Sequence, residues 1–173
     1  MSFNPLPSEP RFAWHNLPPE GGYMYVPIVS PEPFKRVELL IVGWPLVGIF
    51  THYQGDRTVP CYEEINQCAF CQAGYNPRWK GYLACYAAGP GRKVIGEITA
   101  GACRACPDLV DPSCSRRGYR LELMRMGTAR NSLVRARLLP PIPNAPIPDG
   151  FPVEDALLHL WGFATRNGKG VHK

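Results

Sequence analysis

Residues 52–71 read HYQGDRTVPCYEEINQCAFC, and this stretch carries the clearest chemical signal in the chain. It places His52, Cys61, Cys68 and Cys71 with eight, six and two residues between successive members. Cys68 and Cys71 can hold one ion from a tight turn, and a third thiolate with an imidazole completes the tetrahedron that zinc accepts. The acidic and amide residues of the loop offer little apolar surface in which to bury three thiols. We therefore expect a structural Zn²⁺ site formed by these four side chains.

Two alternatives concern the histidine ligand. Cys85 is a further thiol that can replace His52, and His15 can reach the site from the N-terminal segment. A redox role for Cys68 and Cys71 is disfavoured, because such pairs usually begin a helix next to a β-α-β unit and no such unit is evident.

A second group of cysteines comprises Cys103, Cys106 and Cys114. The two residues between Cys103 and Cys106 are a spacing typical of a second metal-binding cluster. A helix that starts at Thr99 gives a different account, since it places Cys103 and Cys106 on one apolar stripe where a thiol behaves as a small hydrophobe. We favour packing in the core and leave a second metal site open.

The distribution of prolines divides the chain. Residues 1–33 and 140–152 are rich in proline, which removes a backbone donor and disfavours regular elements. We expect a proline-rich arm (1–33), a body (34–139) with a zinc subdomain at about 52–75, a linker (140–152), and a short docked helix with a basic tail (153–173).

The apolar runs of the body are short and β-rich, and they are separated by Gly, Pro and Asn. They predict strands near 36–42, 46–53, 80–87, 93–98, 119–126 and 132–138, with the helix at Thr99 between the fourth and the fifth. This order is typical of a small antiparallel barrel of the oligonucleotide-binding (OB) type. The expected fold class is therefore mainly β: an OB-like barrel with an inserted zinc-binding loop, one inter-strand helix and a short C-terminal helix.

The charge of the chain is uneven. The net charge is +5, and residues 116–137 contain seven arginines against the single acid Glu122. Such an excess attracts phosphate backbones, and aromatic rings interleaved with cations can stack bases. The candidate nucleic-acid-binding residues are Arg57, Tyr75, Arg78, Trp79, Lys80, Tyr82, Arg120, Arg125, Arg130, Arg135 and Arg137. Each aromatic among them has an alternative role in the core.

The histidine followed by three cysteines, set as an insertion in a small basic barrel, resembles the single-stranded DNA-binding proteins of T4-like phages. The resemblance covers His52, Cys61, Cys68 and Cys71 and the order of the elements. It implies a zinc subdomain embedded in an OB barrel and a DNA cleft lined by aromatic and basic residues.

These features together favour a protein that binds single-stranded DNA, with RNA also possible, in replication, recombination or the life cycle of a mobile element. The alternative is a zinc-stapled adaptor that binds proteins through its proline-rich arm or C-terminal helix. We do not expect an enzyme, because four protein ligands close the metal site and no catalytic motif accompanies it. The lack of a signal peptide and of a run of about 20 apolar residues predicts a cytoplasmic protein that does not bind membranes.

Overall fold

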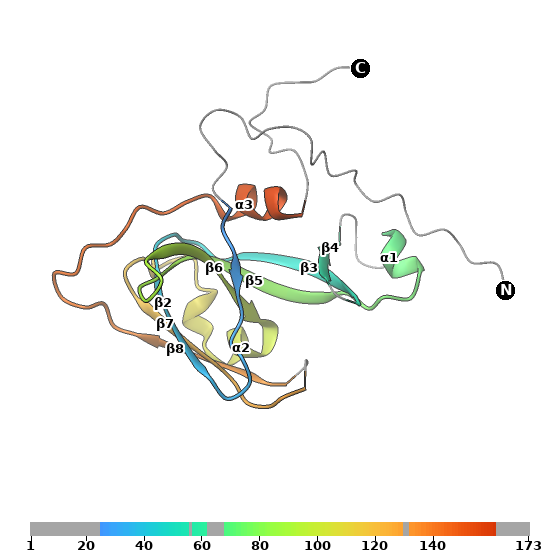
Figure 1. Ribbon diagram of the computed structural model, residues 1–173, viewed down its shortest axis with the longest axis horizontal. Helices are drawn as coiled ribbons and strands as arrows, with labels where there is room; N and C mark the ends of the chain where they lie inside the picture. The colour runs from blue at the N-terminus through green and yellow to red at the C-terminus, as the bar shows by residue number, and fades with distance from the viewer. Residues whose placement is uncertain (1–24, 56, 62–67, 130–131, 162–173) are drawn as a thin grey trace, which may run out of the picture. The chain divides into compact units, whose positions relative to one another are not determined.

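The computed structural model describes residues 25–55, 57–61, 68–129 and 132–161 of the 173-residue chain. These residues form a mainly β structure with eight strands and three α-helices (Figure 1). The strands are β1 (Ile28–Val29), β2 (Arg36–Ile41), β3 (Val47–Gln54), β4 (Arg57–Pro60), β5 (Arg78–Ala87), β6 (Arg92–Thr99), β7 (Arg120–Arg125) and β8 (Val134–Leu139). The helices are α1 (Ala69–Gln72), α2 (Ala100–Ala105) and α3 (Val153–Leu160), and a 3-10 turn covers Pro107–Leu109.

All six strands expected from the sequence are present, as β2, β3, β5, β6, β7 and β8. Two further strands are β1, inside the proline-rich N-terminal segment, and β4, inside the cysteine-rich loop. Both are short, and β4 has no apolar alternation that would have indicated a strand.

The strands form one sheet in the order β1-β6-β5-β2-β7-β8, and β3 pairs with both β4 and β5. This corrects the expectation of a small antiparallel barrel in two respects. No pairing joins β8 back to β6 or β1 among the described residues, so the sheet is open. The sheet is also mixed, because β1 runs parallel to β6 while β5 pairs antiparallel with β6 and β2, and β7 pairs antiparallel with β2 and β8.

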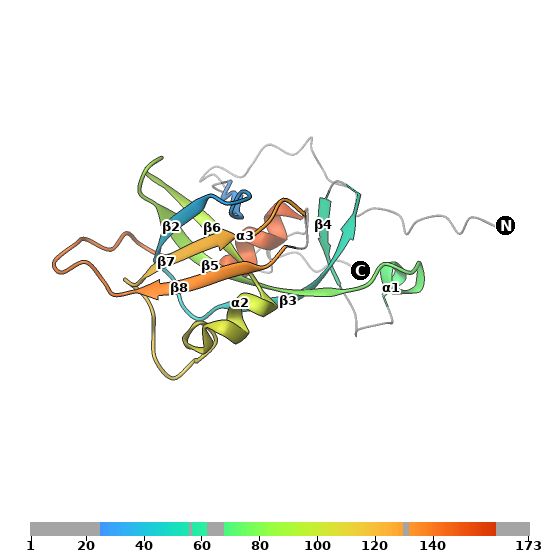
Figure 2. The same cartoon turned by 90° about the horizontal axis from the view of Figure 1, so that it is seen from below.

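Helix α2 lies beside β6 and β8, two strands that do not pair with each other among the described residues. It contacts both β6 and β8, and these two strands also contact each other, although three strands separate them in the sheet order (Figure 2). The sheet is therefore curled. The hydroxyl of Thr99 caps α2 by accepting a hydrogen bond from the backbone N–H of Ala102 at 3.2 Å, as the sequence predicted.

The hydrophobic core lies between the inner face of this sheet and α2. Its members are buried side chains of β2, β5, β6, β7 and β8 together with Ala102, Cys103 and Leu109. Cys103 is buried in this core and Cys106 packs against it, as the packing interpretation expected, but α2 ends at Ala105 and Cys114 is exposed. The alternation expected in β8 is also present, since Val134 is buried whereas Arg135 and Arg137 are exposed.

The chain divides into two compact units. The body unit consists of Val26–Gly48 and Trp79–Val153, and it contains the core. The second unit has Ile49–Arg78 as its central segment. We call it the metal unit, because this segment carries the four predicted metal ligands. Helix α3 forms where the sequence predicted a C-terminal helix, and its buried residues Val153 and Leu157 are one turn apart. Among the described residues, no helix is long and apolar enough to cross a membrane.

Candidate metal centre and basic face

Three short elements of the metal unit carry the four predicted metal ligands. His52 lies in β3, opposite Val59 of β4. Cys61 follows β4 directly, and its backbone N–H donates a 2.7 Å hydrogen bond to the carbonyl of Phe50. Cys68 is the N-cap of α1, and Cys71 lies in that helix. A β-hairpin and one helical turn therefore present all four side chains to one point.

The ligand atoms are spaced as a tetrahedral metal site requires. His52 Nε2 lies 3.1 Å from Cys68 Sγ and 3.5 Å from Cys71 Sγ. The sulfur of Cys68 is 3.5 Å from that of Cys61 and 3.4 Å from that of Cys71, and the remaining sulfur pair is 3.9 Å apart. Zinc–sulfur bonds of about 2.3 Å in a tetrahedron place two sulfurs roughly 3.8 Å apart. The donor set and the spacing both fit a zinc ion.

Aromatic rings and burial support this site. His52 and Cys68 are 1% and 2% exposed, so half of the ligand set is shielded from water. Phe70 packs on the imidazole of His52 with the ring centroids 5.6 Å apart, and Tyr75 meets Phe70 edge-on at 6.2 Å. The Nδ1 atom of His52 is buried, and its partner is not among the described residues. A metal-bound histidine usually donates this N–H to an acceptor that fixes the ring.

The thiols differ in acidity. Burial and the neighbouring thiols of Cys68 and Cys71 raise the pKa of Cys61 to about 12. Burial also acts to raise the pKa of Cys68, but hydrogen bonds outweigh it and hold the pKa of this thiol below its ordinary value. The first of these bonds comes from the backbone N–H of Cys71 at 3.4 Å. The N-terminal turn of α1 thus favours a thiolate at Cys68, which is the form that binds metal.

The alternative thiol ligand, Cys85, lies outside the cluster. Cys85 is fully buried in the core of the body unit, where burial raises its thiol pKa to about 12, and it does not belong to the cluster. His15 lies outside the described residues. Within the described ranges, the group of His52 with the three cysteines is the one set of three or more potential ligands that converges, so Cys103, Cys106 and Cys114 form no second site there.

Several predicted nucleic-acid-binding residues have other roles in the structure. Tyr82 is fully buried beside Glu97, and burial and that carboxylate raise the pKa of its phenol. Its ring is therefore not available for base stacking, which corrects the prediction. Lys80 forms a 2.8 Å ion pair with Glu97. Arg120 binds Glu38 at 3.1 Å and the carbonyl of Pro140 at 3.3 Å.

The remaining aromatic candidates lie at the edges of the packed regions. Tyr75 packs against Phe70 in the metal unit, as described above. Trp79 is half-buried at the periphery of the core, and its indole lies close against the backbone of Gly48 and Gly81. The absence of side chains at these two glycines makes the close approach possible.

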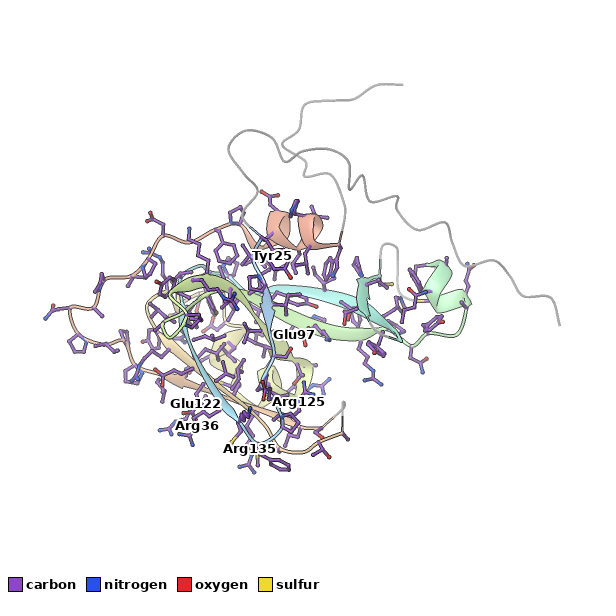
Figure 3. All side chains as sticks on the ribbon, viewed as in Figure 1. Tyr25, Arg36, Glu97, Glu122, Arg125 and Arg135 are labelled. Carbon is purple, nitrogen blue, oxygen red and sulfur yellow. The ribbon has the colours of Figure 1, made fainter. Side chains whose placement is uncertain are left out.

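The basic candidates separate into two groups. Arg78 is exposed in the metal unit, and Arg57 begins β4; Arg130 lies outside the described residues. In the body unit, Arg135 and Arg137 are exposed on the outer side of β8. Figure 3 shows Arg125 and Arg135 at the same end of the sheet as Arg36, with Glu122 beside Arg36.

The sequence interpretation did not select Phe34, Lys35 or Arg36. Arg36 pairs with Glu122 at 3.3 Å and is largely exposed, and Phe34 is one of the exposed large hydrophobic residues. The sequence signal for a nucleic-acid contact was present, because Phe34-Lys35-Arg36 places an aromatic residue next to two cations, as residues 75–86 place aromatic residues next to cations. It was missed because this run lies at the boundary assigned to the arm.

Comparison of the chain with protein-family models, with curated proteins and with solved structures found no match.

Proposed function

We propose that this protein binds single-stranded nucleic acid, with DNA as the expected ligand, and that it holds a structural zinc ion and performs no catalysis. The observation that carries the proposal is the pair of exposed arginines on β8, Arg135 and Arg137, for which no ion pair is found among the described residues. Cations that are not neutralised by carboxylates remain available to phosphates.

The metal centre fits a structural role. Four protein side chains fill a tetrahedron and leave no position for a substrate or an activated water, which a catalytic zinc requires. When bound, zinc would cross-link β3, the end of β4 and α1 through its coordination bonds. His52, Cys61, Cys68 and Cys71 would hold it.

The order of the strands and of α2 along the chain supports an OB-like interpretation of the fold. With β2 and β3 counted as a first, interrupted strand, the chain continues through β5, β6, α2, β7 and β8. An OB fold is a five-stranded, partly open barrel that binds oligonucleotides through strands 2 and 3 and through the loops between strands 1 and 2 and between strands 4 and 5. In this interpretation strands 2 and 3 are β5 and β6, the first of these loops carries the metal centre, and the second joins β7 to β8. The surface that we propose below adjoins this second loop and not the face of β5 and β6.

Charge on the outer face of the sheet adds to this support. Arg36 and Arg120 are partly neutralised by Glu122 and Glu38. On the edge strand, Arg135 lies opposite Met124 and Arg137 lies opposite Glu122, and neither forms an ion pair among the described residues. Most of the Arg36 side chain stays exposed in its ion pair with Glu122, so its guanidinium remains accessible to a phosphate. This face of β2, β7 and β8 is where we place the backbone of the nucleic acid.

A titration of the zinc-loaded chain against fluorescent oligonucleotides of about 20 nucleotides tests the proposal, since one OB fold covers roughly 4–16 nucleotides. Single-stranded and duplex oligonucleotides are compared at two salt concentrations. We expect saturable binding that prefers the single strand and weakens as salt rises.

Absence of binding to any single strand at low salt would refute the proposal. In that case the adaptor hypothesis accounts for the basic face. A pull-down that retains protein partners after nuclease treatment would support the adaptor hypothesis. A duplex bound as tightly as the single strand would also contradict the proposal.

A further inference from the structure

The segment that leads into β2 contains a combination of features that packing does not explain. Phe34 has a backbone φ of +59°, a left-handed conformation that costs free energy for any residue except glycine and is rare for bulky residues. Its side chain is nevertheless 64% exposed, so burial in the core does not compensate for this conformation. An aromatic ring here is disfavoured both by the backbone and by water.

Hydrogen bonds fix this residue at one end of the body unit. The backbone N–H of Phe34 donates to the carbonyl of Arg125 at 2.9 Å, and Pro33 forms an isolated bridge with the same residue. The position of Phe34 is therefore tied to the last residue of β7.

Two exposed arginines lie at the same end of the sheet. In the strand register, Arg36 of β2 and Arg135 of β8 both lie opposite Met124 of β7, so the three residues form one row across the outer face. Strands are about 4.8 Å apart, which places the two arginine backbones roughly 10 Å from each other. Figure 3 shows both guanidinium groups at this end, together with Arg125. The buried Nε of Arg125 has no hydrogen-bond partner among the described residues.

We propose that Phe34, Arg36 and Arg135 form a nucleotide-binding platform in which the ring of Phe34 stacks on one base of a single strand and the two arginines hold the adjoining phosphates. This inference rests on the proposed function and names a contact within it. A stacked base covers an exposed ring whatever its sequence, and each neighbouring guanidinium adds a salt-dependent phosphate contact. The chemistry recognised is a base with its flanking phosphodiesters.

The test compares variants of the full, zinc-loaded chain in titrations with a fluorescein-labelled oligo-dT of about 20 nucleotides. Phe34→Leu should weaken binding by about 5- to 150-fold, the range that corresponds to one lost stacking contact of about 1–3 kcal/mol, without changing the dependence on salt. Phe34→Trp should retain the affinity. Arg135→Ala should reduce the slope of log affinity against log salt by about 0.7.

Two further variants separate stacking from a structural role. Phe34→Gly removes the ring and relieves the backbone strain, so its melting temperature should be no lower than that of the wild type. Its affinity for oligo-dT should nevertheless be reduced, as in Phe34→Leu. Tyr25→Leu is the matched control, since Tyr25 is 70% exposed and is not part of the row that carries Arg36 and Arg135. Its affinity should equal that of the wild type.

The outcomes distinguish this inference from the proposed function. If the wild type binds oligo-dT and both Phe34→Leu and Phe34→Gly bind equally well, the platform is wrong and the proposed function stands. If Tyr25→Leu weakens binding as much as Phe34→Leu does, the effect is not specific to the platform and the inference also fails. If the wild type does not bind at low salt, the proposed function itself is refuted.

Discussion

Cys68 and Cys71 are the residues on which the metal centre depends most directly, because one turn of α1 holds both of them. Each contributes a thiolate whose loss leaves three donors around a zinc ion that needs four. Cys68→Ser and Cys71→Ser should therefore lower the zinc content from about one per chain to a small fraction, measured by elemental analysis after dialysis. Cys114→Ser is the matched control, since Cys114 is exposed and lies outside the cluster. Unchanged zinc in the two α1 variants would contradict the assignment.

The ligand set was predictable at the residue level because the chemistry is local. The Cys68-Ala69-Phe70-Cys71 spacing fixes two donors within one turn, and the remaining two follow from the elements that close the hairpin. Solvent exposure was not predictable in the same way. Tyr82 and Lys80 belong to an aromatic and basic run, but the burial of Tyr82 and the ion pair of Lys80 with Glu97 depend on the pairing register of β5 and β6, which the residue types alone do not show.

The buried thiol of Cys85 gives a pH prediction. Its pKa is about 12 in the folded chain against 9.0 for an ordinary thiol, because burial disfavours the thiolate. The unfolded chain releases this proton above pH 9 while the folded chain retains it. The stability due to the neutral thiol is therefore complete below pH 9 and is lost as the pH rises from 9 towards 12.

Urea denaturation of the zinc-loaded protein at pH 8 and pH 10 measures this loss. Between these two pH values the free energy of unfolding should fall by about 1.4 kcal/mol less in Cys85→Ala than in the wild type. An equal fall in the two proteins would show that Cys85 titrates normally in the folded chain.

At the scale of elements, the strands were predictable because their apolar residues alternate and their turns carry Gly, Pro and Asn. Strand β8 is an example, with Val134 inward and Arg135 and Arg137 outward. The pairing of the strands was harder to predict from the sequence than the strands themselves. The parallel pairing of β1 with β6 joins residues that are far apart in sequence, and two residues of β1 carry no periodicity that could have predicted it.

The packing of β3 against β5 gives a prediction at this scale. A methyl group on Gly48 would lie 2.7–3.0 Å from atoms of the Trp79 indole, closer than van der Waals contact allows. Gly48→Ala should therefore lower the free energy of unfolding by about 1–3 kcal/mol in urea denaturation, and combining it with Trp79→Leu should recover part of the loss. Gly89→Ala, at a position with no atom within 4 Å, is the control. A Gly48→Ala protein as stable as this control would show that the indole lies elsewhere.

The edge strand β8 carries the electrostatic part of the proposed function. Arg135→Ala with Arg137→Ala should flatten the slope of log affinity against log salt by about 0.7 for each lost phosphate contact. Arg120→Ala is the matched control, because Glu38 and the carbonyl of Pro140 already engage that guanidinium. Equal slopes for the double variant and the wild type would place the phosphate contacts on another surface.

At the scale of the whole molecule, zinc and the fold of the metal unit are expected to be coupled. The hairpin and α1 are short, and the binding free energy of a structural zinc is largely folding free energy. A strong chelator should therefore unfold the metal unit while the core of the body unit remains. Hydrogen exchange should show lost protection in Ile49–Arg78 and retained protection in β6 and β7. Retained protection in the metal unit of a zinc-free chain would contradict the coupling.

The central claim is that one chain with one zinc ion binds a single strand, and native mass spectrometry of the full chain mixed with an oligo-dT of about 20 nucleotides tests it most directly. The account predicts a species whose mass equals the chain, one zinc ion and one oligonucleotide, and whose abundance falls as salt is added. A spectrum that contains only free chain at low salt, or only complexes that lack zinc, would contradict it.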